Sequence, residues 1–337
     1  MIARFAGRGH VRIVLGLAVS AVFIGVTVSR VDLNVVAAAL GRVDPVGLAL
    51  ALILVGIEVC LRTLRWQLLL RPIRRVPYRS CLSYSCIGYF ANSLLPARLG
   101  DVARAYLAGG AFRIERIAVL GTILVERLAD GTFILVVVAV VGIAVAGGGS
   151  FAVTALGLGA LAIVGAVGLA GIVFVIRRTG VLQTRIGALA ADLWARLVAG
   201  TVALRSPRGA AAIGGLTVVA FAVAVVAFAV VARSLGVVLS PAQTVLAMGA
   251  VALSMSIPAA PGSLGTYEFV GVAVLTSFGV SPELALATIL LVHLIATLPP
   301  ALAGLIAAWH LHFRVGAIAD VPIAGRLATD PFPADPT

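Results

Sequence analysis

The sequence predicts an all-α integral membrane protein, and three observations lead to that prediction. Of its 337 residues, 61% are hydrophobic and 11% are charged, whereas a soluble domain carries about 25% charged residues. The apolar residues gather in runs of roughly 20 or more, the length needed to cross the hydrocarbon core of a bilayer. The 25 basic residues are all arginines, and most of them lie between these runs. Basic nucleic-acid-binding proteins are not this apolar, so we exclude nucleic acid as a partner.

Six apolar runs predict membrane-spanning helices. The first follows Arg4, Arg8 and Arg12 and resembles a signal peptide, but it is long for one and no convincing cleavage site follows. We therefore interpret it as an uncleaved span. Two further segments, residues 31–41 and 182–204, have the pattern of amphipathic helices at the membrane interface. The six predicted spans are residues 11–29, 45–70, 117–146, 151–176, 209–232 and 282–309.

Two segments between the spans are interrupted by proline and glycine. The first, residues 80–111, breaks at Pro96, and the second, residues 241–278, breaks at Pro258 and Pro261. Each consists of two short apolar arms around the break, which predicts a re-entrant helical hairpin. Irregular backbone at membrane depth is tolerated only inside protein or along a water-filled cavity. We therefore expect a cavity at the two breaks.

The arginines predict the orientation, because cytoplasmic loops are enriched in positive charge. Arginine-rich segments lie before residue 13, at 71–79, at 177–208 and at Arg314. All fall on one side if both hairpins return to the face from which they enter. The N- and C-termini are then cytoplasmic, and the chain is a multi-pass protein of the inner or plasma membrane. The lack of lysine and the abundance of alanine, valine and glycine are typical of a GC-rich bacterial genome.

The two hairpins also mark an internal repeat. The pattern P-x-x-L-G occurs at residues 96–100 and again, 165 residues later, at 261–265. Each half has the order span, span, hairpin, span. Because each half crosses the membrane three times, the second copy has the opposite orientation in the membrane. Inverted repeats with broken helices are typical of secondary transporters. We predict one transmembrane domain over residues 1–312, with halves at about 10–146 and 151–312, and a short cytoplasmic tail over 313–337.

Charged residues inside the spans are the first candidates for chemistry, because each costs about 2.5–3.5 kcal/mol at the centre of a membrane helix. In the second span, Glu58 and Arg62 lie four residues apart and can pair, and Arg65 follows within a turn. A structural role and a functional role are both open for this group.

The third span carries Glu126, Arg127 and Asp130. The two acids share a face, and Arg127 can meet Asp130 at three-residue spacing. Because two acids exceed one base, we expect Arg98 or Arg104, from the preceding hairpin, to complete the group. The group either fixes the hairpin in place or forms a headgroup site or a proton relay, and we favour the functional alternative.

The first hairpin tip, residues 92–104, is the densest polar cluster in the apolar part of the chain. Arg98, Asp101 and Arg104 lie at three-residue spacing, and a helix beginning near Leu99 would aim its free N–H groups at the break. Together with an arginine, this predicts a phosphate site. The alternative is an Arg-Asp-Arg stripe at the cytoplasmic interface. The other candidate residues at this tip are Asn92, Ser93, Pro96 and Gly100.

The second hairpin contains a single charge. Pro261, Gly262 and Gly265 predict a tight backbone, and Glu268 is the only charged residue of residues 241–278. An isolated acid inside a membrane needs a partner or a function. His293, in the last span, could titrate near neutral pH, but a lone histidine is more often a packed side chain whose hydrogen bonds are satisfied.

Signatures of soluble enzymes are missing from the sequence. It contains no Gly-Lys-Ser/Thr phosphate loop, no His-Glu-x-x-His and no Gly-x-Ser-x-Gly. Cys60, Cys81 and Cys86 form no C-x-x-C pair and are interpreted as packing residues. We therefore predict no catalytic residue, no metal and no cofactor.

Four motifs occur in order along the chain. They are Arg62-x-x-Arg65-Trp66, the run from Asn92 to Arg104, Glu126-Arg127-Leu128-x-Asp130, and Pro261-Gly262-Ser263-Leu264-Gly265-x-x-Glu268. This series resembles the flippase-like transmembrane domain of the lysylphosphatidylglycerol synthase/flippase family. The resemblance covers about residues 10–312, with Ser263 standing where a glycine is expected.

The resemblance implies that the chain moves a lipid between leaflets, either an aminoacylated phospholipid or another lipid-linked group such as a polyprenyl phosphate. The lipid phosphate would sit between the two breaks, and the motif residues would line its path. Members with synthase activity carry a soluble aminoacyl-transferase domain after the membrane part, whereas only a short tail follows Arg314 here. We therefore expect a transporter, not an enzyme. The residues assigned to substrate binding are Arg65, Asn92, Ser93, Pro96, Arg98, Gly100, Asp101, Arg104, Glu126, Arg127, Asp130, Pro261, Gly262, Gly265 and Glu268.

Two alternative functions stay open from the residues alone. One is an integral-membrane transferase for a lipid-linked sugar, with Asp101 or Glu126 as its base. The other is an accessory subunit of a lipid-modifying complex that transports nothing. The predicted partners are membrane lipids and, in the second case, a separate lipid-modifying enzyme.

Overall fold

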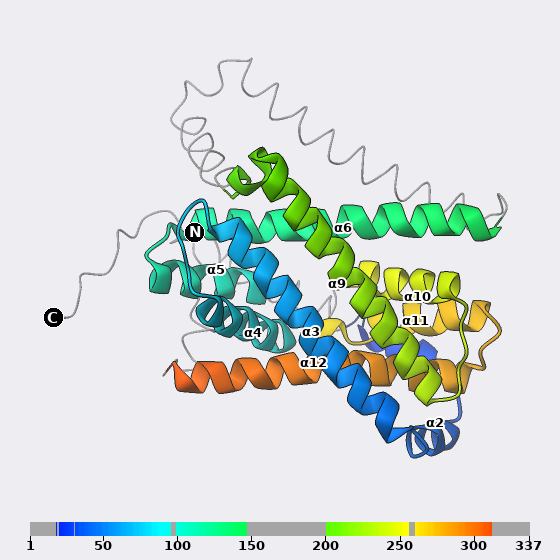
Figure 1. Ribbon diagram of the computed structural model, residues 1–337. Helices are drawn as coiled ribbons and strands as arrows, with labels where there is room; N and C mark the ends of the chain where they lie inside the picture. Colours follow the sequence, from blue (N-terminus) through cyan, green and yellow to red (C-terminus); the bar gives the residue numbers. More distant parts are fainter. Residues whose placement is uncertain are drawn as a thin grey trace. The chain divides into compact units, whose positions relative to one another are not determined.

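The computed structural model describes residues 18, 20–29, 31–95, 99–146, 200–255 and 260–311 (Figure 1). Within these ranges the chain is helical and has no strand. Four helices are long and apolar enough to cross a membrane: α3 (Pro45–Leu70), α6 (Arg116–Ala146), α9 (Pro207–Ser234) and α12 (Pro282–His310). They confirm four of the six predicted spans to within two residues. The protein is an all-helical, multi-pass membrane protein.

Of the other two predicted spans, the structure describes only part of the first, residues 11–29. Residues 151–176 lie outside the described residues, as do the Gly-Gly-Gly-Ser turn, most of residues 182–204 and the tail. From the first span, Ser20–Val28 is helical and meets α2 (Leu33–Leu40) at an angle of 89°. Helix α2 confirms the short helix predicted at residues 31–41. Its N-cap is Asp32, whose carboxylate accepts a hydrogen bond from the backbone N–H of Asn34 (2.8 Å).

Both segments predicted as hairpins are pairs of short helices. The first pair is α4 (Tyr78–Leu94) and α5 (Leu99–Phe112), and the second is α10 (Pro241–Ser254) and α11 (Thr266–Ser277). A 3₁₀ turn, η4 (Pro261–Ser263), precedes α11. At 1.5 Å per residue these helices are about 18–25 Å long, less than the ~30 Å hydrocarbon core of a bilayer.

The order of helix lengths occurs twice along the chain. Helices α3, α4, α5 and α6 have 26, 17, 14 and 31 residues. Helices α9 to α12 have 28, 14, 12 and 29 residues. The starts of corresponding helices are 162, 163, 167 and 166 residues apart. The order long, short, short, long is the one that the sequence predicts for two repeats.

The chain divides into two compact units. Unit 1 comprises Met1–Leu61, Ser85–Asp101 and Val219–Arg314. Unit 2 comprises Arg62–Tyr84, Val102–Val218 and Val315–Thr337. Each unit draws on both halves of the sequence, so the units do not follow the predicted repeat halves. They are described separately below.

The core of unit 1 forms where α11 packs against α10 and α12, and where α12 also contacts α2. Figure 1 shows α10 and α11 as neighbouring short helices. Helix α10 begins with a capping box, in which Ser240 and Gln243 each accept a backbone N–H of the other residue. The largest apolar side chains buried in this core include Phe228, Tyr267, Leu275, Ile289 and Val292.

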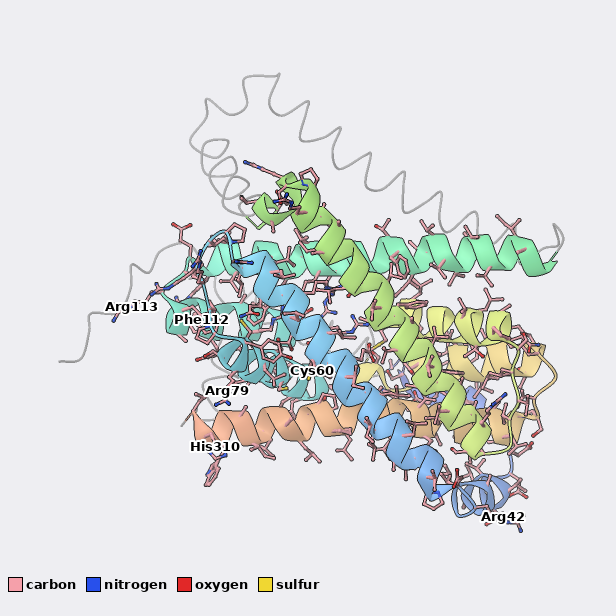
Figure 2. All side chains as sticks on the ribbon, in the orientation of Figure 1. Arg42, Cys60, Arg79, Phe112, Arg113 and His310 are labelled. Carbon is pink, nitrogen blue, oxygen red and sulfur yellow. The ribbon has the colours of Figure 1, made fainter. Side chains whose placement is uncertain are left out.

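The long helices also present large apolar side chains outward. Val46 on α3 and Trp309 on α12 are each 74% exposed, and Val140 on α6 is 60% exposed. Figure 2 shows His310 projecting from the same end of α12 as Trp309. Apolar surface on this scale is typical of helices that face lipid. A tryptophan near a helix end fits the interface between lipid and water.

Helix α12 approaches α4 closely at Gly304. A Cβ atom at this position would clash with the backbone carbonyl of Cys86 and would lie 2.8 Å from the Cβ of Phe90. We expect Gly304→Ala to lower the free energy of unfolding by about 1–3 kcal/mol, because a backbone carbonyl cannot move aside. Thermal unfolding of the purified protein in detergent measures this. Gly214→Ala is the matched control, since a Cβ there meets nothing within 4 Å; an equal loss in both variants would contradict the close packing.

Candidate functional site

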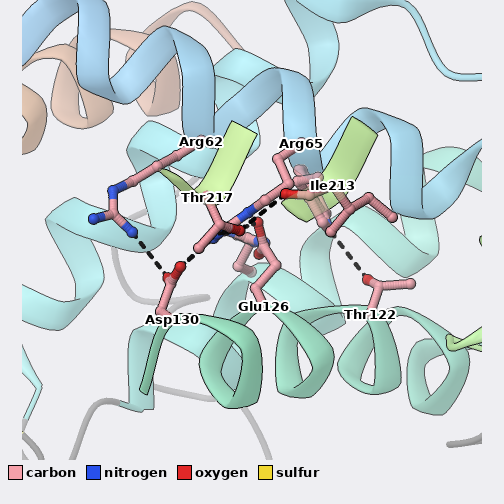
Figure 3. A network of polar contacts seen from close by, with 9 residues as sticks. Arg62, Arg65, Thr122, Glu126, Asp130, Ile213 and Thr217 are labelled. Carbon is pink, nitrogen blue, oxygen red and sulfur yellow. Dashed lines mark hydrogen bonds and ion pairs between the residues drawn. The ribbon is translucent and has the colours of Figure 1, made fainter. Parts of the chain in front are cut away.

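A cluster of charged side chains joins α3 to α6 within unit 2. Figure 3 shows Arg62 and Arg65 on α3 directed toward Asp130 and Glu126 on α6. The Asp130 carboxylate accepts hydrogen bonds from Arg62 Nη1 (2.9 Å) and from Arg65 Nη2 (3.0 Å). Arg65 Nη1 donates to the second oxygen of the same carboxylate. Arg65 therefore holds Asp130 with two parallel bonds, the strong geometry of an arginine–carboxylate pair.

Arg65 extends this cluster to two further side chains. Its Nη1 donates to Thr217 Oγ1 on α9 (2.8 Å), and that hydroxyl donates to the backbone carbonyl of Ile213 (3.0 Å). Its Nη2 lies 3.7 Å from Glu126 Oε1. The Arg65 side chain is only 2% exposed. One buried guanidinium thus links α3, α6 and α9.

Arg104, on α5, completes the cluster from the other side of Glu126. Its Nη2 donates to Glu126 Oε2, and its guanidinium lies 4.0 Å from the centre of the Trp66 ring. The Trp66 indole N–H donates to Thr122 Oγ1 on α6 (3.1 Å). This confirms the expectation that an arginine of the first hairpin segment pairs with the acids of α6. The cluster residues, here called the arginine–carboxylate cluster, are Arg62, Arg65, Arg104, Glu126 and Asp130.

The two deepest arginines of the cluster retain unused donors. A guanidinium has five N–H groups, and within the described ranges the Nε–H of Arg65 and that of Arg104 have no hydrogen-bond partner. A buried donor without an acceptor costs about 1–3 kcal/mol. An oxygen atom from a bound molecule would remove that cost. Both Nε–H groups are buried, and an anionic oxygen is the kind of acceptor that matches an arginine donor.

The first break lies between α4 and α5 in unit 1. Helix α5 begins at Leu99, as predicted, and Asn92 Nδ2 donates to Asp101 Oδ1 (3.3 Å) across the break. A Cβ at Gly100 would clash with the backbone N of Asn92 and the carbonyl of Gly88. Glycine is needed at this position because the two backbones approach so closely.

Of the three other residues predicted at the first break, one forms a hydrogen bond within its own helix and two lie outside the described residues. The Ser93 hydroxyl donates to the backbone carbonyl of Tyr89 (3.1 Å) within its own helix. Pro96 and Arg98 lie outside the described residues. A phosphate-binding role for Arg98 stays a prediction.

The second break places three residues in the left-handed region of backbone space. Gly262 and Gly265 have φ angles of 69° and 88°, and Ser263 has a φ of 59°. A Cβ at Gly265 would lie 2.7 Å from the carbonyl oxygen of Ser20. Glycine is therefore required at position 265 for two reasons, its positive φ angle and the close approach of the helix Ser20–Val28. Pro261 opens the 3₁₀ turn, as the tight backbone predicted.

Glu268 has a partner that the sequence did not identify. Its Oε2 accepts the backbone N–H of Gly265 (2.6 Å), and its Oε1 lies 2.5 Å from His293 Nδ1. The other ring nitrogen, His293 Nε2, lies 2.9 Å from the carbonyl oxygen of Gly262. Tyr267 stacks on the imidazole with ring centres 4.3 Å apart. The burial and hydrogen bonds of His293 agree with its interpretation as a packed, satisfied side chain, which did not identify Glu268 as its partner.

The predicted site residues divide between the two units. Unit 2 holds the arginine–carboxylate cluster and Arg127, which lies half-buried on α6 beside Glu126. Unit 1 holds the residues of the two breaks. The sequence did not single out Trp66, Thr122 or Thr217 as members of the cluster. Over the parts of the chain that the structure describes, no group of three or more His, Cys, Asp or Glu could hold a metal ion.

Comparison with protein families identifies the chain. The family model of the lysylphosphatidylglycerol synthase TM region matches residues 13–304, a range that contains both breaks and the whole arginine–carboxylate cluster. The chain belongs to this family. Lysylphosphatidylglycerol synthase TM regions are membrane domains associated with lipid metabolism or transport, and the resemblance stated from the four motifs is confirmed. Among curated proteins, none matches the chain.

Proposed function

We propose that this chain is a lipid transporter of the flippase type, which moves a phospholipid or a polyprenyl-phosphate-linked lipid between leaflets. Aminoacylated phospholipids belong to the same substrate class. We propose transport as its activity, and not catalysis. Family membership supports a lipid substrate, and the observation that carries the proposal is the buried arginine–carboxylate cluster, which joins the membrane-length helices α3 and α6 to the short helix α5.

The burial of this cluster is costly. Arg65, Arg104 and Glu126 are 2%, 4% and 5% exposed. Taking such charges out of water costs several kcal/mol per ion, and an ion pair returns that cost only with excellent geometry. Apolar residues of similar volume would hold the same helices together at no such cost. Charged residues inside a membrane domain are therefore best explained by a function.

The chemistry of the cluster supports an anionic lipid headgroup as its ligand. The guanidinium groups of Arg65 and Arg104 flank one carboxylate, that of Glu126, and each has a buried Nε–H without a partner within the described ranges. Phosphate oxygens match the planar donor set of arginine. We propose that the lipid phosphate approaches these Nε–H groups while the carboxylates hold the Nη groups in place. Arg127, next to Glu126 on α6, would line the remaining polar path.

We also propose the finer topology that the sequence predicts: six spans, two re-entrant hairpins, and two repeats of inverted orientation with cytoplasmic termini. The four short helices support re-entrance because each is shorter than the hydrocarbon core is thick. The doubled order of helix lengths supports the repeat. Movement of inverted repeats exposes a central site to each side of the membrane in turn.

Retained lipid tests the proposed ligand. The wild-type protein and Arg104→Lys are purified in mild detergent, and their bound lipids are quantified by mass spectrometry. Lysine keeps the positive charge opposite Glu126 but lacks the Nε–H and the planar fork. We expect an anionic phospholipid or polyprenyl phosphate to be enriched in the wild type and reduced at least about fivefold in the variant.

Arg79→Lys is the matched control for this experiment, because Arg79 is exposed on α4 (Figure 2). It should retain the same lipid as the wild type. Bulk lipid in the wild type, unchanged in Arg104→Lys, would remove the cluster as a headgroup site. A covalently altered lipid formed by the purified protein would favour the transferase alternative.

A further inference from the structure

We infer that Glu268 and His293 form a proton-binding site that controls the backbone of the second break. The assignment follows from the hydrogen bonds. A backbone carbonyl can only accept, so His293 Nε2, 2.9 Å from the Gly262 oxygen, carries a hydrogen. The 2.5 Å contact between His293 Nδ1 and Glu268 Oε1 needs one further proton, on either atom. The pair as observed therefore shares one proton, and its net charge is zero wherever that proton lies.

Loss of the shared proton is incompatible with this geometry. With Nε2 still protonated, the lone pair of Nδ1 would face the carboxylate, and two acceptors repel each other. If the hydrogen moved to Nδ1 instead, the lone pair of Nε2 would face the carbonyl of Gly262. Either way, one of the two contacts of His293 is broken.

Gain of a second proton is also incompatible. A hydrogen on Glu268 Oε1 would face the Nδ1–H of the imidazolium, and a hydrogen on Oε2 would face the N–H of Gly265, which donates to that oxygen at 2.6 Å. Two donors then meet, and one hydrogen bond is lost. Only the singly protonated pair keeps all three contacts, from Gly265 to Glu268, from Glu268 to His293 and from His293 to Gly262.

The neighbouring elements leave this pair as the main ionisable group around the break. Neither α10 nor Ser20–Val28 contains an ionisable side chain. Tyr267 stacks on His293, and Glu58 of α3 lies close enough to Tyr267 to interact with it electrostatically. The Glu268 and His293 side chains are each only 8% exposed, so bulk solvent screens the pair little.

The backbone controlled by this pair is able to change conformation. Gly262 and Gly265 adopt left-handed angles that glycine leaves easily. Further along α12, Pro299 and Pro300 lack the backbone N–H groups that would bond to residues one turn earlier. Release of the pair therefore frees the turn before α11, next to a segment of α12 with fewer backbone hydrogen bonds.

In a lipid transporter this site would make the proton the coupling ion, an extension that rests on the proposed function. The proton site itself does not depend on the proposed function, and its test uses no lipid substrate. Hydrogen–deuterium exchange of the full chain in detergent is followed by mass spectrometry at peptides covering residues 260–277, from about pH 5 to pH 9. Protection is expressed relative to intrinsic exchange at each pH.

We expect protection of the turn at residues 260–265 to fall at least about fivefold on the alkaline side, because loss of the shared proton breaks one of the contacts of His293 that hold this turn to α12. Glu268→Gln should abolish this alkaline loss. Its amide donates to Nδ1 and its oxygen accepts from Gly265, so the hydrogen bonds persist without a proton to lose. His293→Gln should abolish the alkaline loss as well, because glutamine does not titrate.

Glu283→Gln and His310→Gln, on the same helix but outside the pair, should keep the wild-type profile. Two results would overturn the inference: wild-type protection that does not fall on the alkaline side, or a fall that persists in either variant of the pair. Because no transport is measured, a failure of this inference is distinguishable from a failure of the proposed function.

Discussion

Asp130→Ala is expected to destabilise the protein by about 3–5 kcal/mol, because it removes the carboxylate that accepts both Nη groups of the buried Arg65. The Asp130 carboxylate is the acceptor for Arg62 Nη1 and for both Nη groups of Arg65. Arg65 is only 2% exposed, so bulk water does not replace these bonds in the observed packing. Thermal and denaturant unfolding of the purified protein, followed by tryptophan fluorescence, measures the loss.

A compensated double variant separates unpaired charge from lost packing. Arg65→Met combined with Asp130→Leu removes both charges and keeps similar volumes, so its loss should be much smaller than that of Asp130→Ala alone. Glu283→Ala, which removes a half-buried carboxylate from the first turn of α12, should cost less than about 1 kcal/mol. A double variant as unstable as Asp130→Ala would show that burial of the unpaired arginine is not the cause.

The four long spans that the structure describes were predictable because the length of an apolar segment decides whether it can cross the membrane. A segment needs about 20 apolar residues to cross the hydrocarbon, and the ends of α3, α6, α9 and α12 lie within two residues of the predicted ends. The breaks were also predictable, since proline and glycine interrupt apolar segments at fixed positions. Helix α5 begins at Leu99 for that reason.

Side-chain partners were predictable only in part. Helical spacing shows which residues share a face of one helix, but a partner from another helix depends on packing between distant segments. The excess of acid on α6 correctly required an arginine from elsewhere, and Arg104 supplies it. The same argument did not identify Arg65 as the main partner of Asp130, or Thr217 as its third contact.

Glu268 illustrates the same limit at the second break. Its isolation in the sequence showed that it needed a partner, and no local pattern named His293, which lies 25 residues away. A search for ionisable residues in the neighbouring predicted spans would have found it. The left-handed conformation of Ser263 had only an indirect signal: serine stands here where a glycine is expected, and glycine is the residue that adopts positive φ readily.

The second large effect is expected on the rate at which a lipid moves between leaflets. The full chain is reconstituted into phosphatidylcholine vesicles that contain traces of fluorescent phosphatidylglycerol or fluorescent polyprenyl phosphate. Chemical quenching of the outer leaflet then reports how fast the probe changes sides. We expect Arg65→Lys combined with Arg104→Lys to slow translocation at least about tenfold, because lysine keeps the charges but not the planar donor set that matches a phosphate.

This translocation assay tests the central claim most directly. The account predicts that wild-type vesicles and Arg79→Lys vesicles move at least one of the two probes faster than protein-free vesicles, and that the double lysine variant does not. The account is contradicted if the wild type moves neither probe, or if the double variant, folded by circular dichroism, moves a probe at the wild-type rate.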